Sequence, residues 1–154
     1  MQIADLITPE SVVPKLKATS KKQALQELAK RVAETYPLDE RAVFEVLLER
    51  ERLGTTGVGN GIAIPHGKLP GLDRLYGLFA RLETPVDFDA VDDQPVDLMF
   101  LLLAPEDAGA DHLKALARVS RLLREQSICE KLRGSDSAEA IYALLTDSMA
   151  SRAA

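Results

Sequence analysis

The segment from Val96 to Ala104 (VDLMFLLLA) constrains the fold more than any other part of the chain, because it is almost continuously apolar. An apolar run of this kind, ended here by Pro105, is typical of a central β-strand that is covered on both faces. A second strand is predicted at Leu75–Leu82, a short strand or turn at Val86–Phe88, and a short strand with turns within residues 3–18. The sequence therefore predicts a sheet whose middle strand is buried.

Apolar residues at helical spacing predict several helices before and after these strands. Ser20 with Gln23, and Asp136 with Glu139, have the spacing of a capping box at a helix N-terminus. The expected helices run from Ser20 to Pro37, from Asp39 to Gly54, from Asp111 to Arg124 and from Asp136 to Leu145, with one further helical turn at residues 127–133. Residues 148–154 are expected to form a frayed tail, which leaves residues 1–147 as one folded domain.

The length of 154 residues fits a single domain with a sizeable core. The net charge of −5 argues against nucleic acid as a partner, because phosphate backbones bind basic surfaces. Cys129 is the only cysteine, so no internal disulfide can form, which is usual in a reducing cytosol. The N-terminus lacks the pattern of a signal peptide, and no apolar run reaches the roughly 20 residues that span a bilayer. We therefore expect a cytoplasmic protein.

The glycine-rich segment Gly54–Gly67 (GTTGVGNGIAIPHG) gives the clearest indication of function, because its glycines and a short apolar run lead to His66. Glycine leaves backbone N–H groups open to a ligand. Pro65 restricts the backbone before His66, and Gly67 leaves the ring without a neighbouring side chain. This pattern predicts an imidazole at the end of a strand, beside a loop rich in amide donors. The order helix, loop, strand is the reverse of that in P-loops and dinucleotide-binding folds, which excludes both.

Two polar residues stand on helix faces that otherwise point inward. Arg50 lies seven residues after Val43 on one such face, and His112 lies seven residues before Val119 on another. Taken alone, Arg50 is typical of an arginine that extends to solvent past an apolar stem, and His112 of a structural histidine at the edge of the core. Beside the glycine-rich segment, Arg50 has the alternative of binding an anion. Together, Arg50, His66 and His112 resemble a site.

Neutral imidazole is available at the pH of the cell, so His66 can itself be a nucleophile that accepts a phosphoryl group. Phosphoryl transfer requires mainly positioning and hydrogen-bond donors around the phosphate oxygens. Arg50 and His112, the latter at a helix N-terminus, are expected to supply some of these donors. The candidate phosphate-binding residues of the glycine-rich segment are Thr55, Thr56, Gly57 and Asn60. This chemistry requires no metal and no other cofactor.

Other interpretations stay open from the residues alone. His66 and His112 with Asp111 could bind zinc, but their spacing matches no usual zinc site and Arg50 would repel a cation. A small-anion-binding module without chemistry and an interaction protein whose histidines are structural are further alternatives. Cys129 lacks the activating neighbours of a catalytic triad, which argues against a cysteine nucleophile.

The residues from Arg50 to Gly67 (RERLGTTGVGNGIAIPHG) closely resemble the phosphorylation loop of enzyme IIA of the phosphotransferase system, fructose/mannitol class. The resemblance is closest to the nitrogen-regulatory members of that class. It continues through Leu82–Pro105 (LETPVDFDAVDDQPVDLMFLLLAP) and the helix start at Asp111–Leu113, so it covers nearly the whole chain. Thr55 and Thr56 stand where a serine–threonine pair is common, a small departure.

The resemblance implies a bacterial cytoplasmic protein of the α/β class, in which a mixed sheet is sandwiched between helices. His66 would be phosphorylated on Nε2, as a tele-phosphohistidine, and His112 and Arg50 would surround the phosphate. The donor would be a histidine-containing phosphocarrier protein. Nitrogen-regulatory members bind targets such as regulators of potassium transport according to phosphorylation state, whereas free-standing sugar-specific members pass the phosphate to a IIB domain. We favour the regulatory function.

Overall fold

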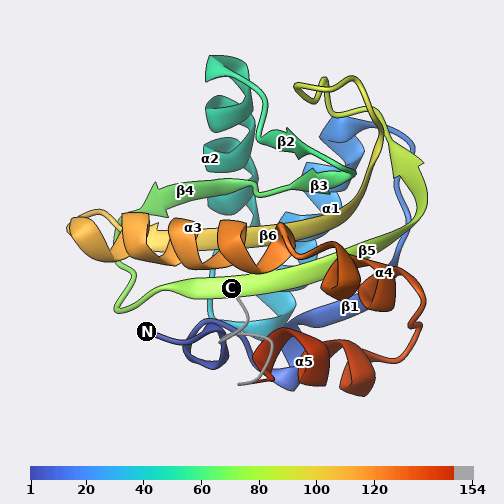
Figure 1. The fold of residues 1–154 in the computed structure, drawn as a ribbon. Helices are drawn as coiled ribbons and strands as arrows, with labels where there is room; N and C mark the ends of the chain where they lie inside the picture. Colours follow the sequence, from blue (N-terminus) through green and yellow to red (C-terminus); the bar gives the residue numbers. More distant parts are fainter. Residues whose placement is uncertain (148–154) are drawn as a thin grey trace.

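A computed structural model describes residues 1–147 as one mixed β-sheet with helices packed on both faces (Figure 1). This arrangement confirms the α/β sandwich that the family resemblance implies. The predicted tail at residues 148–154 lies outside the described residues. The strands are β1 (Val12–Leu16), β2 (Gly57–Gly59), β3 (Ile62–Ala63), β4 (His66–Leu69), β5 (Tyr76–Val86) and β6 (Val96–Pro105). The helices are α1 (Lys21–Thr35), α2 (Glu40–Leu53), α3 (Ala110–Leu123), α4 (Gln126–Arg133) and α5 (Ala138–Thr146).

β6 is the central strand, as the apolar run predicts. The order across the sheet is β1-β5-β6-β3-β2, and β4 also pairs with β6. β6 pairs antiparallel with β5 and parallel with β3 and β4. Its side chains alternate between two separate hydrophobic cores, with Leu98, Phe100 and Leu102 in one and Met99, Leu101 and Leu103 in the other. Helices are therefore required on both faces, because both faces of this strand are apolar.

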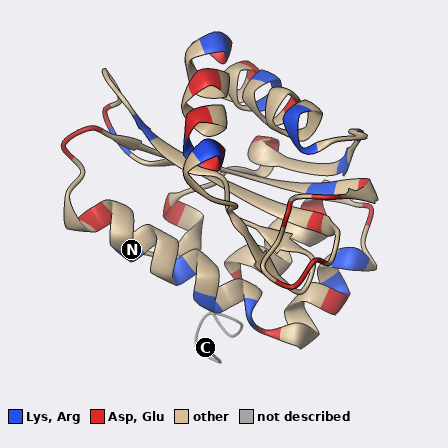
Figure 2. Ribbon diagram, turned by 90° about the horizontal axis from the view of Figure 1, so that it is seen from above, with Lys and Arg blue, Asp and Glu red and all other residues tan. Residues whose placement is uncertain are grey.

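The two cores correspond to two groups of helices. α1 and α2 cover one face of the sheet, and α3, α4 and α5 cover the other (Figure 1). Charged residues lie mainly on the helices and loops, and the strands between them carry few (Figure 2). Within residues 1–147, no helix combines the length and the apolar character that crossing a membrane requires.

The ends of the first two helices are as predicted. The Ser20 hydroxyl accepts a hydrogen bond from the N–H of Gln23 at 3.1 Å, and the Asp39 carboxylate accepts one from the N–H of Ala42 at 3.0 Å. Each bond satisfies one of the N–H groups that a helix N-terminus leaves without a partner. Gly54 follows the last residue of α2, where a glycine commonly ends a helix.

One prediction for the C-terminal part of the chain is wrong. The last helix is capped by Ser137, whose hydroxyl accepts from the N–H of Ala140 at 3.2 Å, and not by Asp136. The helix begins at Ala138, so the N-cap position is that of the residue before it, Ser137. The further helical segment predicted at residues 127–133 is confirmed as α4, in which Ile128 and Leu132, one turn apart, both pack into the core.

β5 and the segment before β1 also differ in detail from the prediction. β5 continues past Leu82 to Val86, because Val86 pairs with Val96 on the central strand. Before β1, the chain makes two short 3₁₀ helices, Ile3–Asp5 and Pro9–Ser11. The strand within residues 3–18 is confirmed as β1.

Gly67 lies where α2 packs against β4. Its neighbour His66 is in register with Leu102, which points toward α3, so the next residue of the strand points toward α2. A Cβ atom at Gly67 would overlap Cγ1 of Val46 on α2. The glycine is therefore needed for the close approach of α2, a reason that the sequence does not reveal.

Replacing Gly67 by alanine is expected to lower the free energy of unfolding by about 1–3 kcal/mol, because the added methyl group overlaps Val46. Urea denaturation followed by circular dichroism measures this change. The double variant Gly67→Ala/Val46→Ala should recover part of the loss, since the second change removes the overlapping atom. If the stability losses of Gly67→Ala and Val46→Ala simply added in the double variant, the overlap would be contradicted.

Candidate functional site

The glycine-rich segment forms a small hairpin followed by the strand that carries His66. β2 pairs antiparallel with β3, and Asn60 and Gly61, with φ values of 57° and 78°, lie between them. β3 and β4 then pair in succession with β6, and Pro65, which has no N–H, lies at the break between them. The expected loop is thus largely an ordered hairpin. His66 is the first residue of β4, so the imidazole lies at the start of a strand.

The His66 ring is half-buried, and its Nδ1 lies 2.8 Å from the carbonyl oxygen of Ile64. A carbonyl oxygen can only accept a hydrogen bond, so Nδ1 carries the ring proton when the imidazole is neutral. Nε2 then has a free lone pair. The backbone two residues away therefore selects the tautomer that is nucleophilic at Nε2.

His112 lies beside His66, although the two are far apart in the sequence. It is buried in the first turn of α3, and the two ring centroids are 5.7 Å apart with the planes tilted by 58°. Within residues 1–147, Nδ1 of His112 is a buried side-chain atom without a hydrogen-bond partner. Buried polar atoms usually have partners, so this one is an exception.

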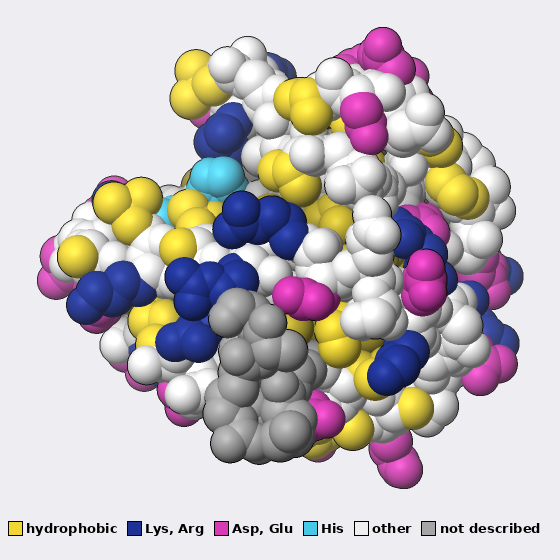
Figure 3. Space-filling view, in the orientation of Figure 1, with side chains coloured by type: hydrophobic (Ala, Val, Ile, Leu, Met, Phe, Trp, Pro, Cys, Tyr) yellow, Lys and Arg dark blue, Asp and Glu magenta, His cyan; other side chains and the backbone are white. Residues whose placement is uncertain are grey.

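Arg50 reaches the same region from the last turn of α2. It is half-buried, and its Nη1 donates a hydrogen bond to the carbonyl oxygen of Gly54 at 2.8 Å. Its positive charge is close enough to lower the pKa of His66. On the face shown in Figure 3, histidine reaches the surface beside Lys or Arg side chains. The structure thus brings together Arg50, His66 and His112, as the sequence predicts.

The surroundings of both histidines favour the neutral form of the ring. Burial is the main cause that lowers the pKa of His66, and the charge of Arg50 lowers it further. The hydrogen bond to Ile64 and the charge of Glu51 oppose this by raising it. Burial also lowers the pKa of His112, with smaller effects from His66 and Lys68 in the same direction. Neutral imidazole has the free lone pair that a nucleophile needs.

Three of the predicted phosphate-binding residues already have partners within the protein. The Thr55 hydroxyl donates to the carbonyl oxygen of Phe88 at 2.6 Å and accepts from the N–H of Gly57 at 3.0 Å. Thr56 is buried, and both its N–H and its hydroxyl donate to the Glu51 carboxylate. Their role toward a phosphate stays a prediction, and in this structure they shape the backbone.

Asn60, the fourth of these residues, lies in the hairpin turn. Its N–H donates to the Asp92 carboxylate at 2.9 Å, and its carbonyl oxygen accepts from Nη2 of Arg133 at 2.7 Å. Arg133 is held in turn by Asp97, with Nε and Oδ2 2.9 Å apart. These contacts fasten the turn to α4 and β6, and the phosphate-binding role of Asn60 stays a prediction.

Glu51 is the residue of this region that the sequence analysis missed. Its side chain is only 4% exposed, and its carboxylate binds both Lys21 and Thr56. The helical periodicity contains the information, because Glu51 lies four residues after buried Leu47 on the same inward face. Charged residues are seldom buried without a partner, so an inward glutamate predicts a buried interaction.

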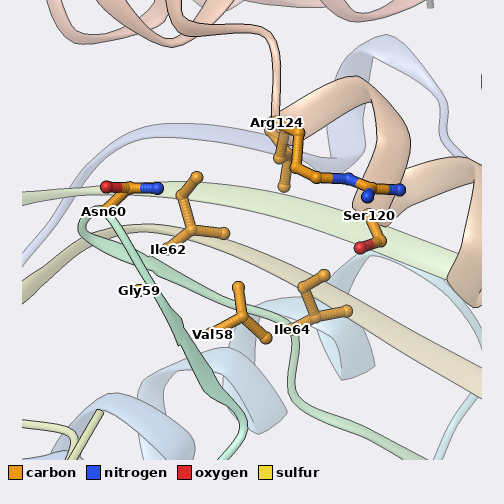
Figure 4. A pocket seen from close by; sticks show the side chains of 8 residues that line it. Val58, Gly59, Asn60, Ile62, Ile64, Ser120 and Arg124 are labelled. Carbon is orange, nitrogen blue, oxygen red and sulfur yellow. The ribbon is translucent and has the colours of Figure 1, made fainter. Parts of the chain in front are cut away.

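A groove with both apolar and polar lining adjoins the site, between the β2–β3 hairpin and α3 (Figure 4). Ile62 and Ile64 line one side of it, with Val58 nearby, and Ser120 and Arg124 line the other. Ile64 is also the residue whose carbonyl holds His66, so the groove and the imidazole share a wall.

The described residues contain no group of three or more His, Cys, Asp or Glu side chains that could hold a metal ion. The geometry instead offers a neutral imidazole with an open Nε2, an arginine and a second neutral imidazole. This set suits an anionic group better than a cation.

A family model described as "Phosphoenolpyruvate-dependent sugar phosphotransferase system, EIIA 2" matches residues 5–148. The nitrogen regulatory protein of Bradyrhizobium diazoefficiens is 66% identical to this chain over 145 residues, which cover 94% of this chain and 95% of the relative. The nitrogen regulatory protein of Escherichia coli K12 is 43% identical over 148 residues, with coverages of 96% and 91%. The crystal structure of nitrogen regulatory protein IIA-Ntr from Neisseria meningitidis has a TM-score of 0.87 at 39% identity, covering 94% of this chain and 99% of that one.

Replacing Arg50 by glutamine is expected to raise the pKa of His66, because the charge that opposes protonation of the imidazole is removed. An NMR titration of the His66 ring resonances measures the shift. Arg52→Gln is the matched control, since Arg52 lies on the same helix end but pairs with Glu49 at the surface. Equal pKa values in the parent and the Arg50 variant would contradict the placement of Arg50 beside His66.

Proposed function

The chain belongs to the EIIA 2 family of the phosphoenolpyruvate-dependent sugar phosphotransferase system, and we propose that it carries a phosphoryl group on Nε2 of His66. Its similarity to nitrogen regulatory proteins over nearly its whole length supports a phosphocarrier of the nitrogen-related branch of that system. The donor in this proposal is a histidine-containing phosphocarrier protein, and the exchange takes place in the cytoplasm.

The observation that carries the proposal is the hydrogen bond from Nδ1 of His66 to the carbonyl oxygen of Ile64. It leaves the lone pair on Nε2, and burial with the nearby arginine keeps the ring neutral. A nucleophile must hold its lone pair in a fixed direction, because a misdirected attack loses much of the rate.

The transfer exchanges one nitrogen–phosphorus bond for another. The lone pair of Nε2 forms a bond to phosphorus while the bond between phosphorus and the donor's imidazole breaks, and that electron pair stays on the donor nitrogen. His66 keeps its Nδ1 proton, which remains hydrogen-bonded to Ile64. No net proton is taken up or released, and the step needs no other reactant.

Arg50 and His112 would stabilise the transferred group. The guanidinium of Arg50 can turn from the Gly54 carbonyl to the phosphoryl oxygens, because a charge-assisted bond to an anion is stronger than one to a neutral carbonyl. The ring of His112 lies beside that of His66, with 5.7 Å between the two centroids. As the ring is neutral, it can donate one hydrogen bond to an oxygen without adding a charge.

The groove beside Ile64 would receive the partner protein. Its apolar walls and the charge of Arg124 can accept an apolar side chain next to an anionic group. A partner seated there lies against the same segment that holds His66. Phosphorylation adds about −1.5 to −2 charges, if the group ionises as other protein phosphates do. Targets that distinguish the two states, which on the family resemblance include regulators of potassium transport, would respond to that change.

His66→Ala is expected to abolish the uptake of acid-labile phosphate from phosphoenolpyruvate and the general phosphotransfer proteins, because no acceptor nitrogen remains. Radiolabelled phosphate bound to the protein measures this. Lys30→Ala, a change on α1 away from the site, should label like the parent. Labelling of His66→Ala at the parent's level would refute the assignment. Onward transfer to a purified fructose-class IIB domain would favour a sugar-specific function instead.

Arg50→Gln is expected to slow phosphoryl uptake by about 10- to 100-fold, which corresponds to the loss of one charge-assisted hydrogen bond of about 1.5–3 kcal/mol. Rapid-quench measurements with limiting donor give the rate, and circular dichroism checks that the fold is intact. Arg52→Gln should transfer at the parent's rate. Equal rates for the parent and Arg50→Gln would remove Arg50 from the site.

A further inference from the structure

We infer that Glu51 is a positioning residue for His66: its buried carboxylate fixes, through Thr56 and Ile64, the carbonyl group that holds the imidazole. Glu51 does not touch the phosphoryl group in this account. Its effect on transfer rests on the proposed function, whereas its effect on the tautomer of His66 can be observed in the unphosphorylated protein.

The Glu51 carboxylate is buried and fully engaged. Oε1 accepts from the N–H of Thr56 at 3.0 Å and from Nζ of Lys21 at 3.2 Å, and Oε2 accepts from the Thr56 hydroxyl. A buried carboxylate is retained only where several donors replace the water that it loses. Two of its three donors belong to Thr56, so the carboxylate fixes that residue in both position and orientation.

A continuous series of hydrogen bonds leads from Thr56 to the imidazole. The carbonyl oxygen of Thr56 accepts from the N–H of Ile64 at 3.0 Å. The carbonyl oxygen of Ile64 then accepts from Nδ1 of His66 at 2.8 Å. Thr56 lies just before β2 and Ile64 just after β3, so this bond closes the open end of the hairpin.

Ile64 depends on this bond because it lies between the two strands. β3 ends at Ala63, β4 begins at His66, and Pro65 between them cannot donate a hydrogen bond. The N–H of Ile64 is therefore held by Thr56 across the hairpin and not by the ladder to β6. Releasing Thr56 would free the N–H of Ile64, and with it the residue whose carbonyl, in the next peptide unit, sets the tautomer of His66.

The charges around Glu51 separate positioning from protonation. Lys21 of α1 lies between Glu51 and Asp89, at 3.2 and 3.4 Å, and Arg50 is adjacent on α2. The negative charge of Glu51 raises the pKa of His66. Removing that charge lowers this pKa further, so a variant keeps His66 neutral at pH 7. Slower transfer in such a variant therefore does not arise from protonation of the imidazole, and the tautomer shows whether the ring is misplaced.

The decisive experiment compares Glu51→Gln with Glu49→Gln in the full chain. Glu49 lies on the same helix but is exposed and pairs with Arg52, so its variant should behave like the parent. In Glu51→Gln, ¹⁵N chemical shifts of the His66 ring above its titration range should show a mixture of tautomers in place of the Nδ1–H form. Phosphoryl uptake at pH 7 should be about 10- to 100-fold slower, as expected for a misplaced nucleophile.

Substitutions at Thr56 test the connection independently of the carboxylate. Thr56→Val removes the hydroxyl, keeps the shape, and should shift the tautomer and the rate in the same direction as Glu51→Gln. Thr56→Ser retains the hydroxyl and should restore both. The double variant Glu51→Gln/Thr56→Val should be no slower than the more impaired single variant, because both break one connection.

The inference would be overturned if Glu51→Gln kept both the Nδ1–H tautomer and the parent's rate of transfer. It would also be overturned if the tautomer shifted only in variants whose near-UV circular dichroism shows lost packing. Failure of the parent itself to take up phosphate would refute the proposed function. The tautomer comparison would still decide whether Glu51 positions the ring.

Discussion

The pairing and burial of β6 are the constraint on which the rest of the structure depends. Both faces of this strand are apolar, so helices must pack on both sides of the sheet. That requirement places α2 on one face and α3 on the other, and β4, paired to the edge of β6, lies between them. His66 begins β4, Arg50 lies in the last turn of α2 and His112 lies in the first turn of α3. The candidate site is therefore assembled where three elements that β6 organises come together.

The site combines a neutral nucleophile with charges of opposite sign on adjacent residues. Arg50 and Glu51 follow one another at the end of α2, yet the first reaches the half-exposed side and the second the interior. Arg50 lowers the pKa of His66 and Glu51 raises it. Each of these two charges affects the pKa of His66 less than burial does. Both side chains can therefore have a further role. Arg50 can bind an anion, and Glu51 can hold the backbone.

The glycine-rich segment shows why a sequence motif and its structural reasons can differ. Its glycines suggest open amide groups for a ligand, yet Gly57 donates its N–H to Thr55, and a Cβ at that position would be only 2.9 Å from Cβ of Ala90. Gly67 makes room for α2. Arg50 and His112, the side chains near His66, come from other elements. Close packing thus accounts for residues that composition alone would assign to a ligand.

The sequence by itself determined the central strand, the capped ends of the first two helices and the family, and it predicted Arg50, His66 and His112 as a site. These features are local, or lie in a single motif, so periodicity and resemblance can indicate them. Only the tertiary structure decided that Glu51 is buried between Lys21 and Thr56, that Thr55 and Thr56 bond inward, and that the Ile64 carbonyl selects the tautomer of His66. Those facts depend on which elements pack together and at what distance, and no spacing along the chain specifies that.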